Sequence, residues 1–181
     1  MTAKRAPHRF SVADYERLIE LGILTENSNV ELIRGEIVAK MSIGDLHVQC
    51  VDILNRLLMR GVGDDAIISI QNPIRLSDSE PEPDVVVKAH SAKGKPSASE
   101  ILLVIEVAES SLDYDREVKL PLYAENGIRE FWIVNLIDRC VEVYRQPQPN
   151  STYADVQTLH AGESISLLAL PTLTISVASL L

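Results

Sequence analysis

Two short apolar runs flank a polar segment near the middle of the chain. The runs are Leu102–Val107 and Phe131–Val134, and an Asn126-Gly127 pair ends the segment between them. This order predicts a parallel βαβ unit rather than a hairpin, because parallel neighbours need a crossover of a dozen or more residues. Glu106 interrupts the first run. A carboxylate inside a buried strand is costly unless it is paired or bound to a metal, so Glu106 is the first candidate for function.

The N-terminal part of the sequence predicts a helix followed by a hairpin. Ser11 is a good N-cap for a helix over about Val12–Leu21. Val30–Ile33 and Glu36–Ala39 then form two strands around an Arg-Gly turn, with Glu31 in the first strand. Before the helix, a loose basic lead contains Lys4, Arg5, His8 and Arg9.

A second helix is expected over about Leu46–Arg60, with Asp45 as its cap. His47 lies on the apolar stripe of this helix, where it is either a core histidine or a site residue. A strand over Ala66–Gln71 follows, and Gln71 at its far end either bonds a loop or faces a site.

The next segment, SDSEPEPD, contains two prolines that favour extended backbone leading into a strand over Asp84–Val87. Glu80 and Glu82 are expected in a solvated acidic loop. After the strand comes a loop that we expect to be mobile and basic, and it either contacts phosphates or is simply solvated. Its basic side chains are those of Lys88, His90, Lys93 and Lys95.

Pro121 complicates the crossover segment because proline breaks the helical hydrogen-bond ladder. We expect either a kink or a short turn near Asp113–Val118 followed by a second helix start, with Lys119 beside the bend. The rest of the chain predicts a β meander, ending in a strand that packs on the core. Its expected strands are Cys140–Arg145, Tyr153–Leu159 and about Leu173–Val177.

Composition adds limits to this picture. A length of 181 residues with 46% hydrophobic residues is typical of one globular domain, here 1–181. The net charge of −9 argues against a surface that binds nucleic acid throughout, so any phosphate-binding face must be local. Cys50 and Cys140 are expected as free thiols, and the absence of a visible signal peptide favours the cytoplasm. No membrane association is expected, because Pro171 divides the apolar C-terminal segment.

Three charged residues lie at or near the apolar strands: Asp84, Glu106 and Lys119. If the strands are neighbours, the two carboxylates can share one divalent ion, which would activate a water and neutralise charge on a phosphoryl oxygen. The lysine can then orient that water or hold a phosphate oxygen. Each residue also has a plainer interpretation. Asp84 could only cap the start of its strand, Glu106 could form a structural ion pair with Lys119, and Lys119 could be a solvated helix residue.

These residues, in order, resemble the Uma-two family of endonucleases, within the PD-(D/E)XK restriction-endonuclease-like group. The resemblance covers roughly Phe10–Trp132 and, more weakly, the tail. It depends on the ordered set rather than on one motif: Glu31 in VELIRGEIV, His47, Pro83-Asp84 before VVV, Glu106 in VIEVAESS, Asp115 with Lys119, and Tyr123, Gly127 and Phe131-Trp132-Ile133-Val134.

The resemblance implies an α/β fold, with a restriction-endonuclease-like core in which helices flank a central mixed β-sheet. It also implies a Mg²⁺ or Mn²⁺ site at Asp84 and Glu106, with Glu31 as the first acidic position and Lys119 as a lysine that has migrated to the helix. Double-stranded DNA is the implied substrate. A homodimer is expected, because cutting both strands needs two sites and twofold symmetry is common.

The sequence departs from the parent pattern at two positions. Ala108 stands where a lysine is expected two residues after the second acid, and Asn135 stands where the family often has Asp. The site therefore depends on Lys119 reaching back to Glu106. Two alternatives to the endonuclease remain open: a catalytically inactive dimeric binding module on the same fold, and a hydrolase of a small phosphorylated ligand, which would need a deep pocket.

Overall fold

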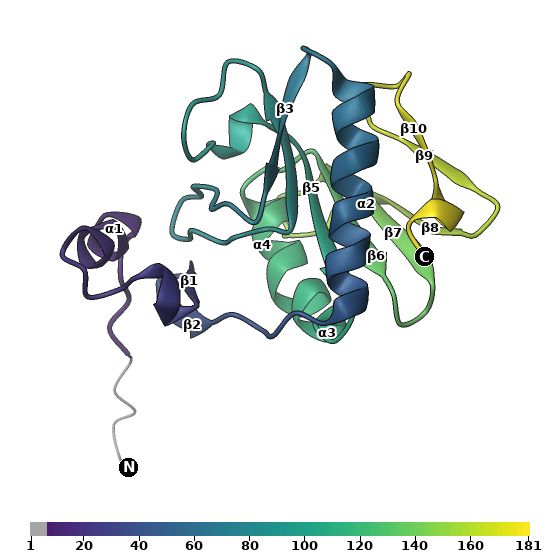
Figure 1. The fold of residues 1–181 in the computed structure, drawn as a ribbon. Helices are drawn as coiled ribbons and strands as arrows, with labels where there is room; N and C mark the ends of the chain where they lie inside the picture. Colours follow the sequence, from purple (N-terminus) through teal and green to yellow (C-terminus); the bar gives the residue numbers. More distant parts are fainter. Residues whose placement is uncertain (1–6) are drawn as a thin grey trace.

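A six-stranded mixed sheet forms the centre of the computed structural model, which describes residues 7–181 (Figure 1). Its order is β3-β4-β5-β6-β7-β8, and only the β5–β6 pair is parallel. The strands are β3 (Ala66–Ile70), β4 (Val85–Ala89), β5 (Ile101–Ala108), β6 (Glu130–Asn135), β7 (Cys140–Pro147) and β8 (Tyr153–His160). The parallel pair confirms the βαβ unit predicted from the two apolar runs.

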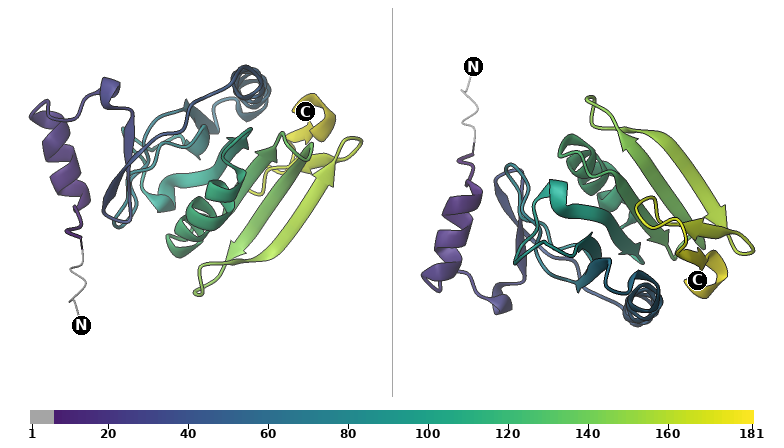
Figure 2. Two further views of the ribbon diagram at one scale, coloured as in Figure 1. Left: turned by 90° about the horizontal axis from the view of Figure 1, so that it is seen from below. Right: turned by 90° about the horizontal axis from the view of Figure 1, so that it is seen from above.

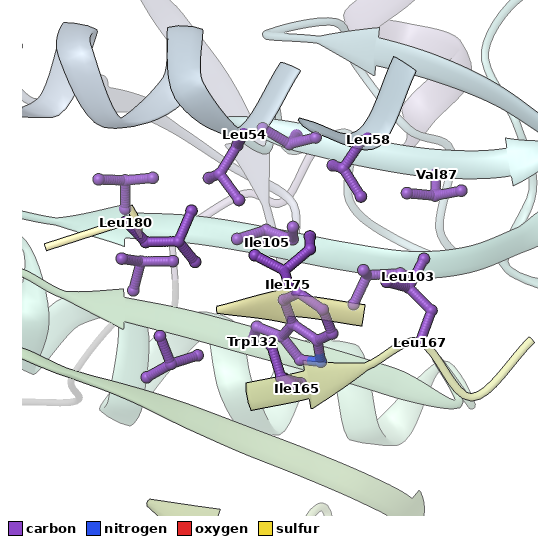
Figure 3. Packing of buried hydrophobic residues seen from close by; sticks show 14 of the residues in the cluster. Leu54, Leu58, Val87, Leu103, Ile105, Trp132, Ile165, Leu167, Ile175 and Leu180 are labelled. Atoms are coloured by element: carbon purple, nitrogen blue, oxygen red, sulfur yellow. The ribbon is translucent and has the colours of Figure 1, made fainter. Parts of the chain in front are cut away.

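Helices cover both faces of the sheet (Figure 2). The long helix α2 (Asp45–Val62) packs on one face through Leu54 and Leu58, which belong to one core cluster with Ile105 and Trp132 (Figure 3). Alternate residues of β5 point to the other face, because side chains along a strand alternate. Glu106 therefore lies on the face opposite α2.

The crossover from β5 to β6 consists of three short pieces on that second face. They are α3 (Leu112–Tyr114), a π-helical turn (Asp115–Lys119) and α4 (Leu120–Glu125). Pro121 lies in the first turn of α4, directly after the π-helical turn, and φ and ψ stay helical through Lys119 and Leu120. The irregularity expected near Pro121 is thus a π-helical turn within a continuous helical segment rather than a second helix start, and Lys119 is the last residue of that turn.

The N-terminal elements also lie close to the predicted bounds. Helix α1 (Val12–Glu20) begins with a capping box between Ser11 and Asp14. The hairpin of β1 (Val30–Ile33) and β2 (Glu36–Ala39) has the predicted strands. Lys4 and Arg5, part of the predicted basic lead, lie outside the described residues.

The start of α2 was predicted wrongly. Gly44, not Asp45, is the N-cap, and it supplies no side chain to the free N–H groups of the first turn. The carboxylate of Glu109, at the end of β5, accepts a hydrogen bond from the backbone N–H of His47 (3.3 Å). A carboxylate at a helix N-terminus is stabilising, so a residue from the sheet caps α2 and ties it to the end of β5.

The C-terminal segment packs on the core, as predicted. It forms the small hairpin β9 (Ser164–Ser166) and β10 (Thr174–Ser176), of which only β10 was expected. Ile165, Ile175 and Leu180 join the cluster beneath α2 (Figure 3). None of the described helices has the length and hydropathy needed to cross a bilayer.

Candidate functional site

A cavity of about 480 Å³ lies where the hairpin, the start of α2, the ends of β4 and β5, and the π-helical turn meet. All six residues predicted for the site line this one cavity. They are Glu31, His47, Gln71, Asp84, Glu106 and Lys119. Residues far apart in the sequence are thus brought together by the hairpin, α2, the sheet and its crossover.

Glu106 and Lys119 form a buried ion pair in this cavity. Lys119 Nζ lies 3.0 Å from Oε1 of Glu106 and 3.9 Å from Oε2 of Glu31. Tyr123, from α4, also donates a hydrogen bond to Oε1 of Glu106 (2.6 Å). Both donors approach the same oxygen, and Lys119 reaches back from the π-helical turn to the carboxylate in β5.

Asp84 lies directly before β4 and belongs to the same arrangement. The pairing of Val85 with Ile105 brings Asp84 opposite Glu106 if the antiparallel register is continued by one residue. Opposed residues in such a pair project to the same face. Oδ2 of Asp84 accepts from the N–H of Val107 (2.8 Å), and Oδ1 is 2.9 Å from Nε2 of His47.

His47 is held against Asp84 and is buried. Burial lowers its pKa, but the hydrogen bond and the charge of Asp84 outweigh burial and raise the pKa above its ordinary value. Gln71 is exposed, has positive φ (48°), and donates its backbone N–H to the carbonyl of Asp84 (3.1 Å). One residue thus orients the Asp84 side chain, and the other fixes its backbone.

The cavity carries an excess of carboxylates over cations. Burial is the largest cause that raises the pKa of Glu106, to about 8; Lys119 opposes this shift, and Asp84 and Asp115 add to it. Asp115 has a pKa raised to about 6, mainly by burial. Burial lowers the pKa of Lys119, but the carboxylates of Glu106, Glu31 and Asp115 outweigh burial and raise it. The lysine therefore stays charged among carboxylates that hold their protons unusually well.

This donor set suits a hard divalent cation, which prefers carboxylate oxygens and keeps several waters. A cation would counteract the burial and, after it, the nearby carboxylates that raise the pKa of Glu106. Within residues 7–181, no group of three or more His, Cys, Asp and Glu side chains is placed to hold a metal ion. Asp84 and Glu106 are the residues that could hold such an ion as a pair, with water completing its coordination.

Several residues that line the cavity or contact its side chains were not among the predicted site residues. Asp115 is buried and accepts from the Ser111 hydroxyl (2.6 Å), and Tyr123 bonds Glu106. Tyr114 lines the cavity, and its buried hydroxyl has no hydrogen-bond partner. Asp115 and Tyr123 belong to the ordered set that resembles the family, and the four-residue spacing of Asp115 and Lys119 also places these two side chains on one helix face. Tyr114 carried no such signal.

The two charged loops before and after β4 were predicted wrongly. Glu80 is buried and pairs with Lys95, and Glu82 is half-buried, lines the cavity and pairs with Lys40. Lys88 is also buried, and donates to the carbonyl of Gly94 (2.9 Å). Glu80, Glu82 and Lys95 are thus paired with charges distant in sequence, so these loops are not simply solvated. His90 and Lys93 of the basic loop stay exposed.

Comparison with known proteins shows the family and the fold of the chain. The model of the Uma2 family, described as "Putative restriction endonuclease", matches residues 12–178. A crystal structure of "a putative nuclease belonging to DUF820" from Anabaena variabilis ATCC 29413 superposes with a TM-score of 0.73 at 18% identity, over 90% of this chain and 96% of that one. No curated protein matches the chain. The structural likeness, at this identity, shows the shared fold.

Proposed function

The chain belongs to the Uma2 family of restriction-endonuclease-type proteins, and from this membership we propose that it is a divalent-metal-dependent nuclease that hydrolyses phosphodiester bonds of DNA. The observation that carries the proposal is the convergence of Asp84, Glu106 and Lys119 on one cavity. Carboxylates of strongly raised pKa beside a buried lysine are typical of functional sites.

In the proposed mechanism, Asp84 and Glu106 hold one Mg²⁺ or Mn²⁺ ion. The ion, when bound, supplies Lewis-acid chemistry: it lowers the pKa of a water and neutralises developing charge on a phosphoryl oxygen. The Lys119 ammonium orients the attacking water or donates to a non-bridging phosphate oxygen. Glu31 supports Lys119 from the hairpin, at 3.9 Å, and His47 holds the Asp84 carboxylate in place.

The catalytically inactive binding module stays a second candidate because of one observation. Both oxygens of Asp84 already accept hydrogen bonds from the protein, and Glu106 is already paired with Lys119. An inactive domain would retain this closed network and would bind its partner without a metal ion. A homodimer is a further prediction for either candidate, and analytical ultracentrifugation tests it.

Cleavage of supercoiled plasmid and of circular single-stranded DNA, each with Mg²⁺ and with Mn²⁺, tests the nuclease. The wild type should cut at least one substrate, whereas Glu106→Gln and Lys119→Met should lose cleavage by about 100-fold or more. Glu117→Gln and Lys93→Met are matched controls, because both positions are exposed and neither lines the cavity. Equal residual cleavage in all five proteins would identify a contaminant and refute the proposal.

A further inference from the structure

The lining of the cavity includes apolar as well as charged side chains. Beside the carboxylates and Lys119, it contains Val38, Met41 and Ile43, which are called the apolar wall below. Met41 and Ile43 belong to the connection from β2 to α2 and are 46% and 52% exposed. Leu46 (59%) and Val48 (49%), at the start of α2, are exposed as well. An apolar surface of this kind at a functional cavity marks a contact site.

The connection that forms this wall is tied to the sheet. Glu109 accepts from the N–H of His47, and a Cβ added at Gly44 would lie 2.3 Å from Oε2 of Glu109. Only a residue without a side chain fits there without displacing that carboxylate. His47 in turn bonds Asp84 (2.9 Å). The segment that carries the apolar wall is therefore tied, through Glu109 and His47, to the residues proposed for hydrolysis.

The negative charge of the cavity disfavours binding of duplex DNA. Duplex binding depends on lysines and arginines that neutralise several phosphates. Of the described residues that line the cavity, only Lys40 and Lys119 carry such a side chain. Lys40 is paired with Glu82, and Lys119 is paired with Glu106. The cavity thus has no basic track that could follow the backbone of a double helix.

We propose that the cavity accepts an unpaired nucleotide, with its phosphate at the wall of Asp84, Glu106 and Lys119 and its base against Met41 and Ile43. This inference rests on the proposed nuclease function and narrows its substrate from DNA in general to DNA with unpaired bases. A duplex presents sugars and phosphates outward and buries the faces of its bases, whereas an unpaired base exposes them for apolar contact. A volume of about 480 Å³ falls in the size range of small-ligand pockets.

Cleavage rates on three DNA substrates of one sequence test the inference: a single strand, a full duplex, and a duplex with a short central gap. The wild type should cut the single strand at least about tenfold faster than the duplex. It should cut the gapped substrate opposite the gap, where the bases are unpaired. A duplex cut as fast as the single strand would overturn the inference and leave the nuclease function standing.

Matched methionine variants test the apolar wall. Met41→Ser combined with Ile43→Ser should raise KM for the single strand by about tenfold, with kcat little changed. Met59→Ser is the control, because Met59 is 59% exposed near the other end of α2 and does not line the cavity. An unchanged KM in the double variant would refute the wall's role. Failure of the wild type to cut any DNA form would refute the proposed function and this inference with it.

Discussion

Nζ of Lys119 lies 3.0 Å from Oε1 of Glu106, although the two residues are 13 positions apart and belong to a helical turn and a strand. The π-helical turn Asp115–Lys119 makes this approach possible. Such turns are rare and recur at functional sites. Arg116, in the same turn, donates to Glu142 of β7 (3.1 Å from its Nε). The turn is thus anchored on one side to β7, while Lys119 reaches the cavity on the other.

The raised pKa of Glu106 predicts a pH-dependent stability in metal-free protein. The folded state keeps the proton up to about pH 8, whereas the ordinary value is 4.5. The folded state therefore binds more protons between these values. This contribution to stability is fully present below the ordinary pKa and is lost as pH rises through the folded-state pKa.

Glu106→Gln cannot ionise, so its free energy of unfolding should fall less than that of the wild type between about pH 5 and about pH 9. Urea denaturation in EDTA across this interval measures the difference. Glu117→Gln, at an exposed position of the π-helical turn, should follow the wild-type curve. Parallel curves for wild type and Glu106→Gln would show that Glu106 is not protonated in the folded state.

His47 is predicted to act by orienting Asp84. His47→Asn should weaken Mn²⁺ binding by about tenfold, because residues that hold a metal ligand typically contribute that much. Isothermal titration calorimetry measures the affinity. His160→Asn is the matched control, since His160 is exposed at the end of β8. Equal affinity in the two variants would show that Asp84 needs no support from the imidazole.

Replacement of Tyr114 and of Tyr153 by phenylalanine should have opposite effects on stability. The Tyr114 hydroxyl is buried without a hydrogen-bond partner, whereas the Tyr153 hydroxyl donates to the carbonyl of Ile128 (3.0 Å). Removal of an unpaired buried hydroxyl avoids a desolvation penalty, and loss of a made hydrogen bond costs about 1 kcal/mol.

Tyr114→Phe should therefore unfold at the same urea concentration as the wild type or a higher one, and Tyr153→Phe at a lower one. A lower midpoint for Tyr114→Phe would mean that its hydroxyl has a partner in solution, such as water.

Local sequence signals predicted most of the fold. The two apolar runs predict the βαβ unit, and Pro121 predicts an irregularity in its crossover helix. The Arg-Gly turn predicts the hairpin. Each signal lies within the segment whose structure it predicts. The family resemblance and the charged residues at strands then indicated the residues that meet in the cavity.

Features that depend on distant partners could not be predicted. Glu80 is buried because Lys95, 15 positions away, pairs with it. The cap of α2 comes from Glu109, 62 positions beyond His47. The apolar wall was also missed, because exposure of Met41 and Ile43 depends on where the hairpin and the start of α2 come to lie. A pattern along the chain carries no information on such approaches.

The central claim is that Asp84 and Glu106 together hold one catalytic divalent ion. Titration with Mn²⁺ at about pH 8, followed by the loss of the free-ion electron paramagnetic resonance signal, tests it most directly. We expect about one ion per wild-type chain and per Glu117→Gln control, and at least about tenfold weaker binding in Asp84→Asn and in Glu106→Gln. Equal binding by all four proteins would place the ion elsewhere or show that the wild type has no such site, and would contradict the account.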